Sequence, residues 1–201
     1  MNLDSQFGQI DIYLFDQLLR GRIRPGLRVL DAGCGGGRNL VYLLREGFDV
    51  YAVDADPRAV ASVHRLVADL APHLPPDRVR QAAVENMPWD DASMDVVMCT
   101  AVLHFARDDA HFDAMVHDLW RVLAPGGMLF ARLASSIGMT LPMEPLGNGR
   151  VLLPDGSERY VVDEARLMAL TRTLGGSLLD PLKTTVVQGQ RCMTTWVVRR
   201  L

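Results

Sequence analysis

A run of glycines follows a single carboxylate early in the chain. Asp31 stands two positions before Gly33, and three more glycines, Gly35, Gly36 and Gly37, complete the segment VLDAGCGGGRNL. Glycine lets the main chain approach a ligand closely, and the negative charge of Asp31 would repel a pyrophosphate while attracting a cation. The segment therefore predicts a binding loop for a ligand that bears an ammonium or sulfonium group.

A second carboxylate lies at a spacing typical of nucleoside sites. Asp54 comes 23 positions after Asp31. In nucleoside-binding sheets an acidic residue about 20 positions beyond the glycine loop reaches the ribose hydroxyls. A cation and a ribose without a pyrophosphate describe S-adenosylmethionine. Asp54 could instead cap the next helix, but Asp56 is better placed to be that N-cap.

Two other nucleotide sites fit these glycines poorly. A dinucleotide loop has the spacing G-x-G-x-x-G/A, whereas Arg38 stands where the last small residue belongs. A phosphate-binding P-loop needs Gly-Lys-Ser/Thr after its glycines, and no such triplet follows here. Arg38 and Asp31 together therefore disfavour a nicotinamide oxidoreductase.

Alternating apolar strands and amphipathic helices must position this loop. Residues 27–33 form a short apolar run that ends in the carboxylate and the glycines, and residues 37–47 continue with helical spacing. A second strand over 48–56, a helix opened by Pro57 and two further strand and helix repeats follow. This order predicts an α/β fold: a doubly wound, Rossmann-like, mostly parallel seven-stranded sheet with helices on both faces.

The two ends of the chain have patterns of their own. Residues 3–20 place apolar side chains at helical spacing and predict one amphipathic helix that stops near Gly21. Two β-branched runs joined across residues 188–190 predict an antiparallel terminal hairpin, because so short a link cannot make a parallel crossover. Residues 137–156 lose periodicity and predict a long loop of the kind that often carries function.

We expect one domain, since 201 residues with 49% hydrophobic composition can bury a single core. Its expected parts are an N-terminal helix covering the pocket (1–26), a cofactor-binding core (27–136), a substrate loop (137–160), and a C-terminal helix and hairpin (161–201). Met139 and Met143 in the loop could line an acceptor site or form the contact of a homodimer.

The composition limits the partners. The 21 basic and 24 acidic residues are intermingled and leave a net charge of −3, so we expect no nucleic-acid partner. Three cysteines at irregular spacing fit a reducing compartment better than a disulfide framework or a metal site. Acidic residues interrupt the N-terminal apolar positions, and no uncharged apolar run reaches membrane-spanning length. We therefore expect a cytoplasmic protein with no membrane partner.

Five segments resemble, in family order, the motifs of the class I S-adenosylmethionine-dependent methyltransferases. They are VLDAGCGGGRN, VYAVDADP, VENMPWDDASMDVV, AVLHF and LWRVLAPGGMLF, and the resemblance covers residues 27–133. The GRN after the glycines and the following GFDV are similar to small single-domain members such as the tellurite-resistance methyltransferases. The resemblance implies S-adenosylmethionine as the cofactor and methyl transfer by in-line displacement. Because the chain has no added domain or basic surface for a macromolecule, we expect a small-molecule acceptor.

The resemblance also implies roles for individual residues. Asp54 would bind the ribose hydroxyls, and Ala55 and Met87 would lie against the adenine. Thr100 and Ala101 would line the methionine portion. The complete expected cofactor-binding set is Asp31, Gly33, Cys34, Gly35, Asp54, Ala55, Val84, Glu85, Met87, Thr100 and Ala101.

One position departs from the family pattern. Many members have Asp-Ala where this chain has Ala83 and Val84, so the carboxylate that usually meets the adenine amino group is absent. Glu85 could replace it, or the main chain of Val84 could suffice. The departure is also what favours the alternative hypothesis, a non-catalytic module that binds the same cofactor.

Three residues could serve the acceptor. His104 follows the fourth strand and titrates near neutral pH, so it is either a general base or a packed core residue. Arg132, near the end of the fifth strand, either binds an anionic substrate or pairs with an acidic neighbour. Tyr13 either roofs the pocket or packs its helix on the sheet. The other histidines, His64, His73, His111 and His117, are expected to meet solvent.

Overall fold

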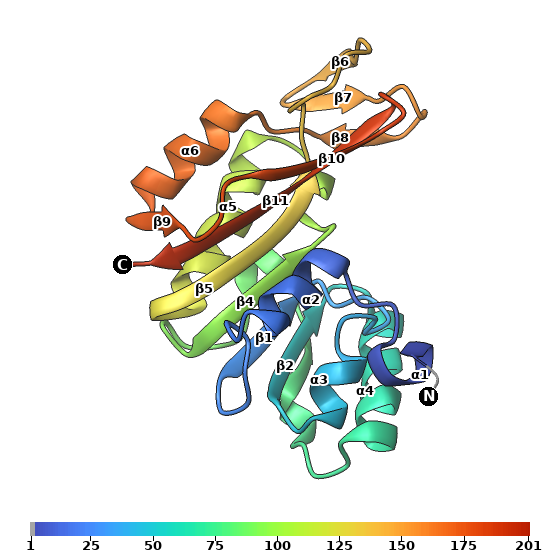
Figure 1. Cartoon of the computed structure of the whole chain (residues 1–201), viewed down its shortest axis with the longest axis vertical. Coiled ribbons are helices and arrows are strands. Elements are labelled where there is room, and N and C mark those ends of the chain that lie inside the picture. The colour runs from blue at the N-terminus through green and yellow to red at the C-terminus, as the bar shows by residue number, and fades with distance from the viewer. Residues whose placement is uncertain (1–2) are drawn as a thin grey trace.

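A mostly parallel sheet forms the centre of the computed structural model, which describes residues 3–201 apart from the side chain of Asp4 (Figure 1). Its strand order is β10-β11-β5-β4-β1-β2-β3, and β9 pairs along β11. Strands β1 to β5 run parallel, and β11 is antiparallel to β5, β9 and β10. The predicted α/β sheet with its antiparallel terminal hairpin is confirmed. The strands are β1 (Arg28–Ala32), β2 (Asp49–Asp54), β3 (Val79–Gln81), β4 (Met94–Thr100), β5 (Leu123–Ala134), β9 (Gly176–Leu178), β10 (Lys183–Val187) and β11 (Arg191–Arg200).

Helices cover both faces of this sheet. On one face α5 (Asp109–Val122) and α6 (Glu164–Thr173) pack over side chains such as Val97 and Cys99 of β4. On the other face α2 (Ile12–Leu19), α3 (Val41–Arg45) and α4 (Pro57–Leu70) pack over Val96 and Met98. Because successive residues of β4 enter opposite cores, its central residues 96–99 are all apolar, as is typical of strands in a covered parallel sheet.

Short single-turn helices link some of these elements. The 3-10 helix η1 (Pro76–Arg78) precedes β3, η2 (Val84–Asn86) follows it, and η3 (Leu103–Phe105) follows β4. Both η2 and η3 leave the sheet at the carboxyl ends of parallel strands. They therefore lie at the edge where a doubly wound sheet binds its ligands.

Aspartates start four of the helices. Asp11, Asp56, Asp108 and Asp163 each accept a hydrogen bond from a main-chain N–H in the first turn of α2, α4, α5 and α6 respectively. Such a cap satisfies one of the N–H groups that a helix start leaves without a partner. Asp56 and the first helical residue Pro57 behave as their sequence predicts.

The prediction of one helix over 3–20 is wrong. The structure has α1 (Leu3–Phe7) and then α2, which begins at Ile12. Gly8 separates them with φ of +61°, and a Cβ at Gly8 would lie 2.8 Å from Cγ2 of Val41 on α3. The helical pattern breaks because the chain must pass close to α3 in a conformation that favours glycine.

Residues 137–156 are not the continuous loop that their lost periodicity predicted. They contain β6 (Glu144–Gly147) and β7 (Arg150–Leu152), which pair with β8 (Glu158–Tyr160) in a second, antiparallel sheet. Asn148 and Gly149 form the β6–β7 turn with positive φ angles, as tight hairpins require. Figure 1 places this small sheet next to the tip of the β10–β11 hairpin.

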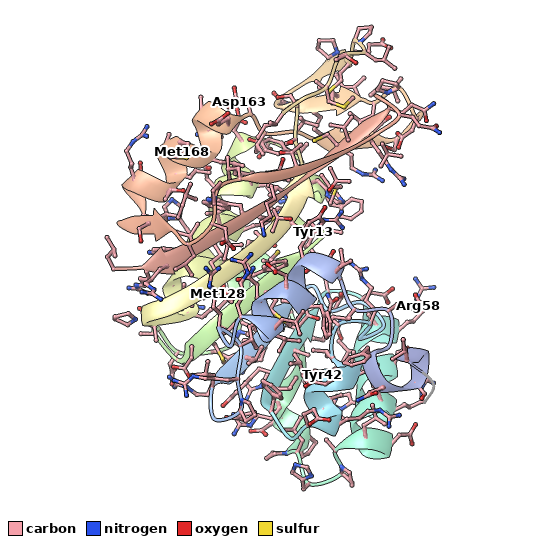
Figure 2. All side chains as sticks on the ribbon, in the orientation of Figure 1. Tyr13, Tyr42, Arg58, Met128, Asp163 and Met168 are labelled. Atoms are coloured by element: carbon pink, nitrogen blue, oxygen red, sulfur yellow. The ribbon has the colours of Figure 1, made fainter. Side chains whose placement is uncertain are left out.

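The start of α2 is fixed to β5 and β10 by polar contacts. The Asp11 carboxylate, only 4% exposed, accepts a hydrogen bond from Nη1 of Arg132 at 2.8 Å. The hydroxyl groups of Tyr13 and Thr185 lie 2.6 Å apart, and the Arg132 guanidinium stacks 5.2 Å from the Tyr13 ring. Tyr13, labelled in Figure 2, thus extends from α2 toward the strands.

We predict that Asp11→Ala lowers the free energy of unfolding by about 2–3 kcal/mol. It removes the cap of α2 and leaves the Arg132 charge unpaired, and the cost falls below that of a fully buried pair because the Arg132 side chain keeps 21% of its exposure. Urea denaturation followed by circular dichroism measures the effect. The control is Asp16→Ala on the same helix, whose ion pairs with Arg20 and Lys183 are partly exposed to solvent, so a smaller loss of about 1 kcal/mol is expected. Equal losses in both variants would contradict the prediction.

Candidate active site

A cavity of about 640 Å³ lies at the carboxyl ends of β1, β2 and β4, and we call it the glycine-loop cavity. The chain leaves β1 for β2 on one side, while β4 lies on the other, so this is the switch point at which a doubly wound sheet opens a crevice. The lining residues are Gly33, Cys34, Gly35, Gly36, Arg38, Asn39, Asp54, Ala55, Ala83, Val84, Glu85, Thr100, Ala101, Val102, Phe105, Arg107, His111 and Met115.

Nine of the eleven residues expected to bind the cofactor are in this wall. They are Gly33, Cys34, Gly35, Asp54, Ala55, Val84, Glu85, Thr100 and Ala101. Asp31 and Met87 are not in the wall: both are buried, and the main-chain N–H of Met87 donates to Asp118 at 2.7 Å beneath it. The structure brings the set together around one cavity, and the contact that each residue makes with a ligand stays a prediction.

The glycines do two different jobs in the loop. Gly33 has φ of +78°, and a Cβ there would lie 2.4 Å from Cγ2 of Val102, so this position must stay small for the loop to pack. Gly35 has φ of +51°, and a Cβ there would meet nothing within 4 Å. Because Gly35 lines the cavity, that empty space is room for a ligand close to the main chain.

Asp54 ties the second strand to the glycine loop. Its Oδ2 accepts a hydrogen bond from the N–H of Gly35 at 2.8 Å, and its Oδ1 accepts one from Asp56 at 2.9 Å. A carboxylate has about four lone-pair sites, so each oxygen keeps the capacity to accept another hydrogen bond. The arrangement fixes an acceptor pair at the cavity wall that suits a vicinal diol.

Asp31 is a buried carboxyl beneath the loop. It is 1% exposed, and its Oδ2 has no hydrogen-bond partner among the described residues. Burial raises its pKa to about 7; Arg38 opposes this rise and the charge of Asp54 adds to it. Burial and the two aspartates also raise the pKa of the Cys34 thiol, which therefore stays protonated. The buried hydroxyl of Thr100 likewise has no partner within residues 3–201.

His111 lies in the cavity wall, so the prediction that it meets solvent is wrong. Its Nδ1 accepts a hydrogen bond from the main-chain N–H of Arg107 at 3.1 Å. Its Nε2 is 3.0 Å from Oε1 of Glu85, and with Nδ1 accepting, Nε2 is the nitrogen that donates. The sequence feature that could have placed His111 at the cavity is its position in the first turn of the helix that follows β4, since such turns lie at the ligand-binding edge of the sheet.

A second cavity, of about 290 Å³, lies on the other side of Ala101, which lines both. We call it the arginine cavity, because three of its wall residues are arginines. Its walls come from the ends of β5 and β10, the start of β11 and the β7–β8 turn of the small sheet. The lining residues are Ala101, His104, Arg132, Ala134, Leu153, Asp155, Ser157, Arg159, Thr185, Val187, Arg191, Cys192 and Met193.

The three residues expected to serve the acceptor lie in or near this second cavity. His104 is 6% exposed and lines it, and burial together with the Arg159 charge lowers the pKa of His104 to about 4. Its imidazole is therefore neutral at pH 7. Arg132 lines the cavity and also pairs with Asp11, which is the acidic neighbour expected as one of its two alternatives. Tyr13 is in the wall of neither cavity.

Residues 3–201 contain neither a metal-binding cluster nor a membrane-spanning helix. There, no cluster of three or more His, Cys, Asp or Glu side chains is arranged to bind a metal ion. Among the helices of that same stretch, none combines the length and the apolar character needed to span a bilayer.

Known proteins resemble this chain across the glycine-loop cavity. Residues 30–131 match the family model described as Methyltransferase domain. A ubiquinone biosynthesis O-methyltransferase of Xanthomonas axonopodis pv. citri is 30% identical over 172 residues, which are 82% of this chain and 69% of that protein. An uncharacterized methyltransferase of Synechocystis sp. is 32% identical over 106 residues, 53% of this chain. The match spans 46% of that relative, so the chain covers about half to two thirds of these proteins.

A solved structure supports the fold. The 1,6-didemethyltoxoflavin-N1-methyltransferase of Burkholderia thailandensis, with bound 1,6-didemethyltoxoflavin and S-adenosylhomocysteine, superimposes with a TM-score of 0.67 at 21% identity. The superposition covers 93% of this chain and 75% of that one. It agrees with the Rossmann-like sheet and terminal hairpin described above.

We predict that Asp31→Asn stabilises the ligand-free protein more at high pH than at low pH. The folded pKa of Asp31, about 7, is raised above the ordinary 3.8, so its contribution to stability is lost as pH rises toward 7. Between about pH 5 and about pH 8 the advantage of the variant should grow by about 2–3 kcal/mol. Urea denaturation of both proteins at the two pH values measures it, and a pH-independent difference would contradict the burial of an ionisable carboxyl.

Proposed function

The chain belongs to the methyltransferase domain family, and on this premise we propose that it transfers a methyl group from S-adenosylmethionine to a small-molecule acceptor. The observation that carries the proposal is the glycine-loop cavity itself. Three parts of it fall within the matched residues 30–131: the glycine loop, the Asp54 carboxylate that accepts a hydrogen bond from Gly35, and the end of β4. The family membership supports an enzyme of the transferase class.

The residues of the cavity fit the parts of S-adenosylmethionine. Asp54 would accept hydrogen bonds from the ribose hydroxyls, and Ala55 and Val84 would lie beside the adenine. Glu85, oriented by His111, keeps Oε2 for the adenine amino group, which supports Glu85 as the replacement for the carboxylate missing at Ala83.

The methionine end has the matching polar groups. The unpartnered hydroxyl of Thr100 lies at the end of β4, where the amino acid portion would lie. Arg38 offers a cation to the methionine carboxylate, and the buried charge of Asp31 favours the ammonium and sulfonium groups. Unsatisfied buried polar atoms are costly in a protein, and a ligand that satisfies them stabilises the fold.

Chemistry at this site depends on alignment. When bound, S-adenosylmethionine would supply an electrophilic methyl carbon on a positively charged sulfur, from which the acceptor's lone pair would displace a neutral thioether. The chain's own task is to hold both molecules in line across Ala101 and to keep water out. Such positioning lowers a barrier by roughly 7–11 kcal/mol. Neutral His104 can accept a hydrogen bond from the acceptor, and an acceptor that carries a proton loses it to solvent or to this imidazole.

Calorimetric titration with S-adenosylmethionine and with S-adenosylhomocysteine tests the proposal. We expect micromolar dissociation constants, about −8 kcal/mol, for both compounds. A screen with methyl-labelled cofactor against thiols, amines, hydroxyls and carboxylates then tests transfer. Failure of both compounds to bind would remove the proposal, and binding without any transfer would favour the non-catalytic module.

We predict that Gly35→Val abolishes binding of S-adenosylhomocysteine, because the new side chain would occupy the open space beside the loop. Gly26→Val is the matched control: Gly26 also has a positive φ, +89°, with open space around it, but it precedes β1 away from the cavity. Both variants carry backbone strain of about 1–2 kcal/mol or more, so the midpoint temperature of thermal denaturation should be lower in both. Normal binding by folded Gly35→Val, or by the milder Gly35→Ala, contradicts the prediction.

A further inference from the structure

The arginine cavity concentrates positive charge in a small space. Arg132, Arg159 and Arg191 line it, whereas Asp155 is the single carboxylate in its wall. The Asp155 pKa is lowered, first by hydrogen bonding to Ser157 and then by the charges of Arg191 and Arg159. Asp11, outside the wall, pairs with Arg132, so Asp155 is the one wall carboxylate left for Arg159 and Arg191, and a net positive charge remains.

Two of these arginines are available to a ligand. Arg132 is paired with Asp11, but within residues 3–201 no carboxylate forms an ion pair with Arg159 or Arg191. Arg159 is half-buried; its Nη1 donates to the main-chain oxygen of Glu158 at 2.7 Å, and its guanidinium lies 5.1 Å from the centre of the Phe105 ring. Stacking and one main-chain bond fix the direction of Arg159 while leaving most of its five N–H donors unused.

Buried polar atoms in the same wall also lack partners. Nδ1 of His104 and Nε of Arg132 are buried with no hydrogen-bond partner in the described part of the chain. His104 is more than nine-tenths buried, and its ring forms part of the cavity wall. Buried donors and acceptors are almost always satisfied, so these atoms indicate a polar ligand that the cavity receives.

The position of the cavity connects it to methyl transfer. Asp54 places the ribose side of the glycine-loop cavity at β2, which leaves the methionine side at the ends of β1 and β4. Ala101, just after β4, separates that side from the arginine cavity. A molecule in the arginine cavity would therefore lie next to Ala101, on the side opposite the place proposed for the methyl group.

We infer that the arginine cavity binds the methyl acceptor, and that the acceptor is a small organic anion whose carboxylate or phosphate group pairs with Arg159 and Arg191. The inference rests on the proposed function and names its substrate class. Arginine is suited to this task because its planar fork binds carboxylate or phosphate oxygens in pairs. Arg132 stays with Asp11 and contributes its Nε to the same anion, while His104 accepts a hydrogen bond from the rest of the molecule.

Calorimetric titration of the full chain with benzoate, inorganic phosphate and neutral benzamide tests this inference. The titrations are run in low-chloride buffer, with and without saturating S-adenosylhomocysteine. We expect benzoate or phosphate to bind and benzamide to give no heat. The anion that binds more tightly shows whether the arginines recognise a carboxylate or a phosphate group of the acceptor. Benzamide binding as tightly as benzoate, or neither anion binding at about 10 mM, overturns the inference.

Single substitutions locate the anion. Arg159→Gln and Arg191→Gln should each weaken its binding about tenfold, and Arg159→Lys should retain part of it because the charge remains. The control is Arg150→Gln: Arg150 lies on the same small sheet but pairs with Glu158 and lines a different cavity, so anion affinity should not change. Unchanged affinity in both Arg159→Gln and Arg191→Gln contradicts the inference.

The two proposals fail in different ways. Neither Arg159 nor Arg191 lines the glycine-loop cavity, so both glutamine variants should bind S-adenosylhomocysteine as the parent chain does. Loss of cofactor binding in the parent chain counts against the proposed function. Normal cofactor binding with no arginine-dependent anion binding counts against the anionic acceptor alone.

Discussion

The constraint on which the site depends is a buried carboxyl group, one oxygen of which has no hydrogen-bond partner within residues 3–201. Asp31 lies one residue before the end of β1, at the switch point of the sheet, between two parallel strands. Ionisation there is costly, which is why its pKa rises to about 7. The loop above it is built of glycine, so the main chain leaves open space where a positively charged group could approach. An electrostatic preference for cations thus follows from a packing requirement of the fold.

A second aspartate distributes charge between the two cavities. Asp11 pairs with Arg132 of the arginine cavity at 2.8 Å, and Nη2 of Arg38, from the glycine-loop cavity, lies 3.9 Å away. Because Asp11 also caps α2, the helix that covers the sheet is fixed by the same group that offsets these two cations. Arg159 and Arg191 share the single wall carboxylate of Asp155 and form no ion pair with it, so a net positive charge remains on the side of the arginine cavity.

The sheet could be predicted because its central strands are buried on both faces. A strand such as β4 then appears as an apolar run over residues 96–99, and its carboxyl end marks the site. The small sheet of β6, β7 and β8 could not be predicted, since its short strands are largely exposed and carry no alternation. The break at Gly8 depends on its contact with α3, and the pairing of His111 with Glu85 joins residues 26 positions apart. Local periodicity predicts neither of these two features.

Ala101 explains how two neighbouring cavities can serve one reaction. It has φ of +63°, a left-handed conformation that costs a residue with a side chain roughly 1 kcal/mol or more. The sheet maintains it, because the N–H of Ala101 donates to the main-chain oxygen of Arg132 at 2.8 Å, which continues the pairing of β4 with β5. This turn places the short side chain of Ala101 in the wall of both the glycine-loop cavity and the arginine cavity. A sulfonium on one side and an anion on the other would then attract each other across the shortest path between them, so electrostatics and geometry favour the same alignment.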